Sequence, residues 1–226
     1  MTTLDPTTRV ADIVAARPET ARVFQRHQID FCCHGETPLD SAVAARGGSL
    51  ADVIAELDES SRALAEKDGD VRGMSVAALI ARIVDRHHGY LRTALPFIAP
   101  LTAKVARAHA QHDPRVVEVE ASFGRLREML EPHLDEEERS LFPLLMYRGR
   151  DPGTVERELA TMRRDHLAVG GVLAHLRELT DGFAVPGWAC ATFRLLMGEL
   201  EKLELDVLRH VHLENHVLAP MALGQP

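Results

Sequence analysis

Two pairs of side chains with identical spacing raise the first chemical question in this sequence. His133 is followed four residues later by Glu137, and His210 is followed four residues later by Glu214. Residues four apart share one face of a helix, so each pair could present a nitrogen and an oxygen to the same region. Both pairs fall where the apolar stripe of a helix would otherwise continue.

The same interruption occurs in all four long periodic segments of the chain. Each segment has an apolar stripe with steps of three and four residues, as expected for a helix that buries one face. A histidine breaks every stripe, and two of the stripes add a glutamate one turn later. The residues that interrupt the stripes are His87, His133, Glu137, His166, His210 and Glu214.

Such a set of buried side chains predicts a metal site. Burying two unpaired carboxylates costs several kcal/mol each, so a cation is expected between them. One tetrahedral zinc ion takes four ligands and would leave two acids unexplained. Two metal ions that share both carboxylates would use the whole set, and mixed imidazole and carboxylate ligands suit iron, with manganese and zinc as less selective alternatives.

We therefore predict two non-haem iron ions bridged by carboxylates and by an oxo or hydroxo group. The predicted metal ligands are the six residues named above, and His88 is the main rival of His87 for its position. In each pair the histidine precedes the glutamate, whereas ferritin-like sites use Glu-x-x-His. This order argues against a ferritin-type site.

The elements that must position these residues are predicted to be helices. The four segments cover about 75–108, 115–147, 154–180 and 188–219, and short turn-rich pieces separate them. This pattern predicts an all-α fold with an up-down four-helix bundle. Prolines inside the segments predict kinks or earlier helix ends; they are Pro96, Pro100, Pro132 and Pro143.

The rest of the chain is predicted to form a small helical domain. We place this domain at 1–60, a charged linker that contains glycine at 61–74, and the bundle at 75–226. Ser49 is expected to cap the helix that follows it.

Cys32 and Cys33 lie side by side in a predicted turn of the small domain. One reading is a buried thiol with an incidental neighbour. The other is a pair of exposed thiolates that bind or pass metal, exchange electrons or cross-link a partner. Cys190, the third cysteine, is expected to be a small core residue.

Composition narrows the class of protein. The chain has 226 residues, of which 46% are hydrophobic and 27% charged, with a formal net charge of −8. This charge disfavours nucleic acid and anionic membrane surfaces as partners. No stretch approaches the roughly 20 apolar residues of a membrane-spanning helix, and the first residues do not read as a secretory signal, so we expect a cytoplasmic protein.

Several stretches resemble a known family. RHHGYLR, HLDEEERSLFP, MRRDHLAVGG and HVHLENHVLAP look like a hemerythrin-like domain. FQRHQIDFCCHG resembles the small cysteine-bearing domain of the iron–sulfur cluster repair di-iron proteins, the RIC family. Together these matches cover nearly the whole chain in the domain order of that family.

The resemblance implies a function. The family's di-iron ligands map onto the six predicted ligands, and its cysteines map onto Cys32 and Cys33, which we take as candidate cofactor-binding residues. The implied role is repair of iron–sulfur clusters damaged by nitric oxide or oxidants, through donation of iron. The alternatives are an oxygen or nitric oxide sensor and a di-iron nitric oxide reductase, so whether the chain is an enzyme stays open.

The implied partners are damaged iron–sulfur proteins, with nitric oxide or dioxygen as ligands, and a homodimer is conceivable. One departure from the resemblance is His34, which stands where glycine is expected in many relatives. This histidine could loosen or extend metal binding near the thiols.

Overall fold

The chain is described by a computed structural model that covers residues 4–63 and 71–224, with the side chains of residues 62, 63 and 72 excepted. As predicted, the fold is all-helical: over the described residues the only β feature is an isolated bridge between Arg9 and Pro38. Residues 64–70, half of the predicted linker, lie outside the described residues. On either side, helix α4 continues to Ala63 and a short 3-10 helix covers Val71–Gly73.

The four predicted long segments form four long helical stretches, and three of them contain a π-helical turn. Their parts are α5 (Val76–Ile83), η3 (Val84–His88) and α6 (Gly89–His109); α7 (Arg115–Glu136), η4 (Glu137–Leu141) and α8 (Phe142–Met146); α9 (Pro152–Leu179); and α10 (Ala191–Leu213), η5 (Glu214–Leu218) and α11 (Ala219–Ala222).

The chain packs into two compact units, which are described separately. Ala81–Val207 form one unit, here called the bundle unit. Met1–Ile80 together with Leu208–Pro226 form the other, here called the terminal unit. The boundary passes through α10, so the last turns of that helix belong to the terminal unit.

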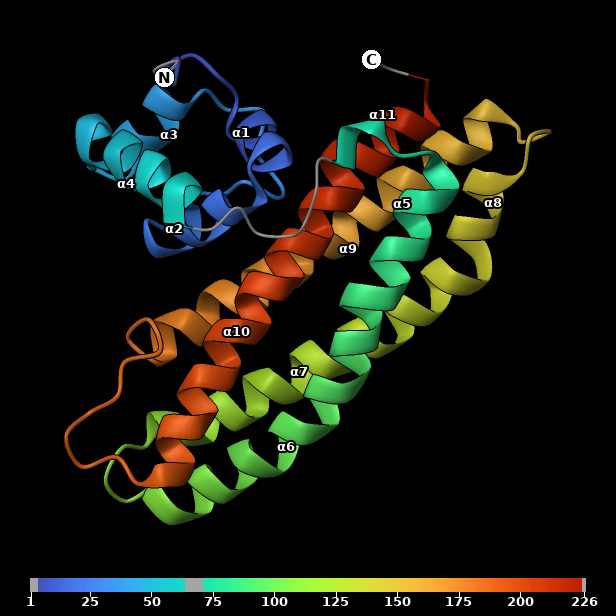
Figure 1. The fold of residues 1–226 in the computed structure, drawn as a ribbon. Coiled ribbons are helices and arrows are strands. Elements are labelled where there is room, and N and C mark those ends of the chain that lie inside the picture. The colour runs from blue at the N-terminus through green and yellow to red at the C-terminus, as the bar shows by residue number, and fades with distance from the viewer. Residues whose placement is uncertain (1–3, 64–70, 225–226) are drawn as a thin grey trace. The chain divides into compact units, whose positions relative to one another are not determined.

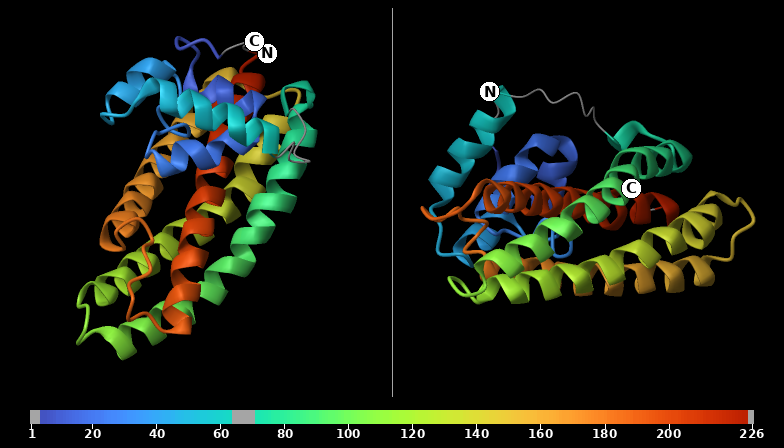
Figure 2. Two further views of the ribbon diagram at one scale, coloured as in Figure 1. Left: turned by 60° about the vertical axis from the view of Figure 1, so that its left-hand side comes forward. Right: turned by 90° about the horizontal axis from the view of Figure 1, so that it is seen from below.

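The bundle unit is built on long helices that bury their apolar stripes against one another. Helix α6 packs on α7, and α7 packs on α9; the long helices run alongside each other in both figures (Figures 1 and 2). Asp151 caps α9, because its carboxylate accepts a hydrogen bond from the backbone N–H of Thr154 at 2.8 Å. The stripe residues buried in this unit include Leu91, Phe123, Leu126, Leu130, Leu159, Met162, Leu173, Leu196 and Leu200.

The prolines do not end these helices early. Helix α6 continues through Pro96 and Pro100, and α7 continues through Pro132. Pro143 lies in the first turn of α8, directly after a π-helical turn, where its missing N–H costs little.

The terminal unit contains the small helical domain. Its core includes Phe24, Phe31, Leu39 and Leu57, which are fully buried. The helices of this unit that lie before residue 75 are α1 (Val10–Ala16), η1 (Pro18–Thr20), α2 (Ala21–Arg26), α3 (Leu39–Ala44), α4 (Leu50–Ala63) and η2 (Val71–Gly73). Ser49 directly precedes α4 and accepts a long hydrogen bond, 3.4 Å, from the N–H of Asp52.

Between α2 and α3 lies the loop that carries the cysteine pair. Its backbone is tied to α1, because Val10 N–H donates to the Thr37 carbonyl and Ala11 N–H donates to the Gly35 carbonyl. A side chain at Gly35 would place its Cβ 2.6 Å from the Phe31 carbonyl oxygen, so only glycine fits there.

Candidate metal centre

The predicted ligands of the bundle unit meet beside π-helical turns. Glu137 is the first residue of η4, and His88 is the last residue of η3. A π turn closes i→i+5 hydrogen bonds, so it inserts one residue into the helical repeat and redirects the neighbouring side chains. Such turns occur frequently at functional sites.

His133, Glu137 and His166 bring three donor atoms together. His133 Nε2 lies 3.2 Å from Glu137 Oε1 and 3.2 Å from His166 Nε2, and His166 Nε2 lies 3.9 Å from the same Glu137 oxygen. Two donors about 2.1 Å from one ion and at right angles to each other are about 3.0 Å apart. The three atoms are therefore spaced as ligands of a single cation would be.

His88 approaches the other oxygen of the same carboxylate. Its Nε2 lies 3.4 Å from Glu137 Oε2, and its side chain is 1% exposed. The carboxylate of Glu137 thus faces His133 and His166 with one oxygen and His88 with the other. A carboxylate placed in this way could offer a ligand atom to each of two cations.

Here the structure differs from the sequence prediction, which placed His87 in the site. His87 instead donates a hydrogen bond from its Nδ1 to the carboxylate of Asp206 in the same unit, at 3.0 Å. The prediction assumed α-helical steps of four from Ile83 to His87 to Leu91. The π turn makes the first step five residues, from Ile83 to His88, and the second step three.

The second ring nitrogen of His88 is held by Glu138, a residue outside the predicted ligand set. Its Nδ1 lies 2.8 Å from Glu138 Oε1, which also accepts a hydrogen bond from Arg92 at 3.0 Å. Burial acts to raise the pKa of Glu138, but the hydrogen bonds from His88 and Arg92 outweigh it and keep that pKa below its usual value. A carboxylate in this position fixes the tautomer and orientation of a metal-binding histidine.

His210 and Glu214 belong to the terminal unit, at the junction of α10 with η5. His210 Nε2 lies 2.9 Å from Glu214 Oε1, and their side chains are 1% and 0% exposed. The predicted pairing on one helix face is therefore present. Glu214, like Glu137, is the first residue of a π turn.

Among the residues that the structure describes, histidine and glutamate side chains, nearly all of them buried, form two groups that could hold metal ions. In the bundle unit, Glu137 belongs to both groups, with His88 in one and with His133 and His166 in the other. Imidazole nitrogens and carboxylate oxygens are ligands for iron, manganese and zinc alike. The residues present therefore fit a metal centre of the predicted chemistry.

The cysteines form a different cluster. Cys32 is buried, Cys33 is half-buried, and their sulfur atoms lie 3.5 Å apart. The hydrogen bond with Cys33, together with burial, raises the pKa of the Cys32 thiol well above its usual value. Cys190 contradicts the expectation of a core residue, because it is exposed at the start of α10.

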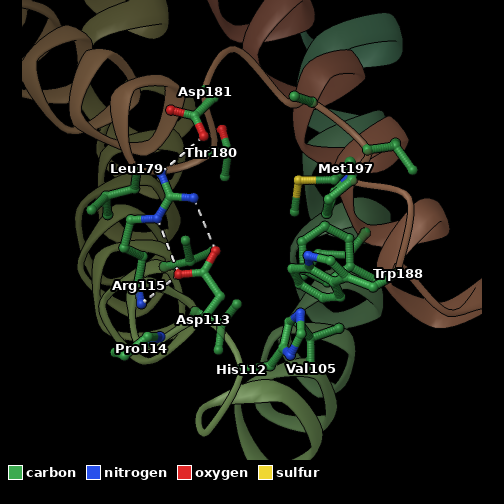
Figure 3. Close-up of a pocket in the computed structure, with 17 residues that line it drawn as sticks. Val105, His112, Asp113, Pro114, Arg115, Leu179, Thr180, Asp181, Trp188 and Met197 are labelled. Atoms are coloured by element: carbon green, nitrogen blue, oxygen red, sulfur yellow. Dashed lines mark hydrogen bonds and ion pairs between the residues drawn. The ribbon is translucent and has the colours of Figure 1, made fainter.

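The bundle unit also contains a cavity of about 440 Å³, which lies away from the histidines and glutamate described above. Figure 3 shows Arg115 between Asp113 and Asp181, with Trp188 and His112 across the opening. Arg115 forms ion pairs with both aspartates, at 3.0 and 2.9 Å. The charged groups that line this cavity therefore neutralise one another for the most part.

This all-helical fold, with its buried histidines and glutamates, belongs to a known class of cation-binding domain. Residues 79–222 match the hemerythrin HHE cation binding domain. Residues 6–61 match a second family, ScdA_N, described as a domain of unknown function.

Full-length relatives place the chain more narrowly. It is 31% identical over 214 residues to the iron–sulfur cluster repair protein ScdA of Staphylococcus haemolyticus. The aligned residues make up 92% of this chain and 95% of that relative. It is also 31% identical to the iron–sulfur cluster repair protein YtfE of Edwardsiella ictaluri, over 95% and 96% of the two chains. A probable iron–sulfur cluster repair protein of Haemophilus influenzae is 27% identical over 96% of this chain. The chain belongs to the ScdA/YtfE family of iron–sulfur cluster repair proteins.

Among the residues that the structure describes, no helix combines the length and the apolarity needed to cross a membrane.

Proposed function

We propose that this chain is a di-iron protein that restores iron–sulfur clusters damaged by nitric oxide or oxidants, by donating iron. The observation that carries the proposal is the carboxylate of Glu137, whose two oxygens face two different sets of histidines. The names of the relatives give the process in which those proteins act. The proposed domains are 1–60 and 75–226, joined by 61–74, and the matched ranges 6–61 and 79–222 support this division.

The proposed ligand set is His88, His133, Glu137, His166, His210 and Glu214. His88 replaces His87 because, of these two neighbours, it is the one whose ring lies near Glu137. His210 and Glu214 are included because they are buried, they form a His-x-x-x-Glu pair like His133 and Glu137, and they fall inside the matched cation-binding domain. When bound, a di-iron pair would supply binding and redox chemistry toward nitric oxide or dioxygen.

The protein's own residues would hold and release this iron. Glu137 would bridge the two ions, the histidines would complete their coordination, and Glu138 would keep His88 in the tautomer whose Nε2 lone pair is available. With few protein ligands for each ion, coordination positions would remain open, as transfer to a client cluster requires. The clients proposed are iron–sulfur proteins that have lost activity through cluster damage.

The test is recovery of an inactivated enzyme. The ferrous protein is added anaerobically to an iron–sulfur enzyme that nitric oxide has inactivated, and the return of activity is followed over time. We expect recovery with the native chain, and a loss of at least about tenfold in the initial rate with Glu137→Gln, because the bridging charge is removed. Glu128→Gln, an exposed position on α7, is the matched control and should behave as native.

Two other outcomes would overturn the proposal. Reversible binding of gas without any recovery would indicate a sensor. Catalytic formation of nitrous oxide without transfer of iron would indicate a nitric oxide reductase.

A further inference from the structure

The cysteine loop of the terminal unit has a third acidic group at its centre. The Oδ1 atom of Asp30 accepts hydrogen bonds from the backbone N–H groups of Cys32, at 3.0 Å, and Cys33, at 2.8 Å. It also lies 3.4 Å from the sulfur of Cys32. An aspartate that binds the backbone two and three residues ahead of it stabilises a turn. In this turn both cysteine side chains lie on the side of the carboxylate.

The spacing of the sulfur atoms fits chelation of a cation and not a disulfide. A disulfide bond is about 2.05 Å long, whereas the two sulfurs lie 3.5 Å apart. Two thiolates about 2.3 Å from a tetrahedral ion are about 3.8 Å apart. A thiolate and a carboxylate oxygen on the same ion are about 3.6 Å apart, close to the 3.4 Å between Cys32 Sγ and Asp30 Oδ1.

The charge of the cluster points to the same kind of ligand. Three acidic groups lie within 4.8 Å of one another, and one of them, Cys32, is only 4% exposed. Two thiolates and a carboxylate could not all be charged in such a place without a counter-ion, because burial strongly disfavours unpaired charge. A divalent cation would remove this cost.

We propose that Cys32, Cys33 and Asp30 form a binding site for one thiophilic divalent cation in the loop between α2 and α3. On binding, each thiol transfers its proton to solvent and its sulfur forms a bond to the ion, so two protons leave for each ion bound. No change of oxidation state is involved. The site uses none of the histidines and glutamates of the proposed di-iron centre, so it stands or falls independently of that proposal.

The backbone of the loop is held in place for this task. His212 Nδ1 donates to the Phe31 carbonyl at 3.0 Å, and the side-chain amide of Asn215 donates to the Cys32 carbonyl at 2.9 Å. Both donors belong to the terminal unit and flank Glu214 in sequence. A rigid support of this kind preorganises ligands and lowers the entropic cost of binding.

The exposed side of the loop would offer the ion a fourth coordination position. Cys33 is half-buried, and the His34 side chain is 62% exposed with its Nδ1 2.7 Å from Asp30 Oδ2. His34 therefore orients the aspartate in the manner of a residue behind a metal ligand. An open position suits a site that exchanges its ion, whereas structural zinc sites have four protein ligands.

Cobalt(II) alone is the probe, because thiolate ligands give it a charge-transfer absorption that imidazole and carboxylate ligands do not. The chain has three cysteines, so the titration is done anaerobically on iron-loaded, full-length Cys190→Ser protein, in which only Cys32 and Cys33 remain and the proposed di-iron centre is already filled. We expect the thiolate band to saturate at about one equivalent, with about two protons released. Zinc(II) added afterwards should bleach the band.

Variants identify the ligands. Cys32→Ser/Cys33→Ser should abolish the band, and Asp30→Asn should weaken cobalt binding at least about tenfold. Asp52→Asn, an exposed aspartate of the same small domain, should have no effect. Far-ultraviolet circular dichroism of each variant confirms that it is folded.

A band that is absent from folded Cys190→Ser protein, or that persists without both cysteines, would overturn the site. If the Asp30→Asn variant bound cobalt with unchanged affinity, Asp30 would not be a ligand, and the site as proposed would be wrong. Glu137→Gln should lose iron but keep the thiolate band, which separates a failure of this inference from a failure of the di-iron proposal.

Discussion

Neighbouring residues of the same type have different surroundings at two places in the bundle unit. His88 faces Glu137, whereas His87 donates a hydrogen bond to Asp206. Glu137 is 2% exposed and faces three histidines, whereas Glu138 is more accessible and holds the far side of the His88 ring. Residue type alone does not distinguish such neighbours. They differ in the direction in which each side chain leaves the helix axis.

The first prediction at the residue scale concerns the two histidines. His88→Ala should reduce iron from about two ions per chain to about one or fewer, because a ligand and its carboxylate support are lost together. His87→Ala should retain iron and only lower stability, since its partner is Asp206. Metal analysis of the two purified variants measures this difference. The opposite pattern, with iron lost only from His87→Ala, would refute the assignment of His88.

Cys190 provides a pH-dependent prediction. Its sulfur accepts a hydrogen bond from the N–H of Phe193 at the start of α10, and His109 Nε2 lies 3.3 Å away; these interactions lower the pKa of the thiol to about 7. A lowered pKa leaves the reactive thiolate populated above pH 7, and it is lost as the pH falls below that value.

In Cys32→Ser/Cys33→Ser protein, the rate of alkylation by iodoacetamide should therefore rise with a midpoint near pH 7. Replacing His109 with glutamine should move the midpoint upward. A midpoint near that of an ordinary cysteine, about 8.5, would show that the helix start does not stabilise the thiolate.

At the scale of elements, most of the fold could be predicted from the sequence. The periodicity of Leu126, Leu130 and their counterparts marked the long helices and their buried faces, because burial of one stripe is what the pattern reflects. The start of α9 can also be predicted, because an aspartate at the N-cap followed by proline at the first helical position is a local signal for the beginning of a helix.

The π turns could not be predicted in this way. A π turn has no composition of its own, and its extra residue becomes stable only through the tertiary contacts of the side chains that it redirects. A stripe read in steps of three and four therefore led to His87. At two of the π turns the sequence carries a run of identical residues, His87-His88 and Glu136-Glu137-Glu138, and such a run leaves open which member faces inward.

The contacts of the cysteine loop lay equally beyond sequence reasoning. The sequence shows that Cys32 and Cys33 are adjacent. It does not show that Asp30 binds their backbone N–H groups, because this depends on the turn. Nor does it show that His212 and Asn215 donate hydrogen bonds to the loop, because these contacts join segments about 180 residues apart. Periodicity gives the face of a helix, and it carries no information about which distant loop that face supports.

At the scale of the whole molecule, metal and stability should be coupled. Glu137, His166, His210 and Glu214 are almost completely buried, so a protein without metal must keep charged or protonated groups in its interior. Iron that binds only the folded state stabilises it by about 2.7 kcal/mol at a free concentration of 100 times the dissociation constant.

For a chain of this size, that difference corresponds to a rise in melting temperature of about 5–10 °C. Differential scanning calorimetry of the iron-loaded chain and of the same chain after chelation should show this shift. The double variant Glu137→Gln/Glu214→Gln should melt at one temperature with or without iron, because the acids that bind the cation are gone. If chelation left the melting temperature of the native chain unchanged, the buried acids would owe their place to something other than a metal, and the di-iron proposal would fail with them.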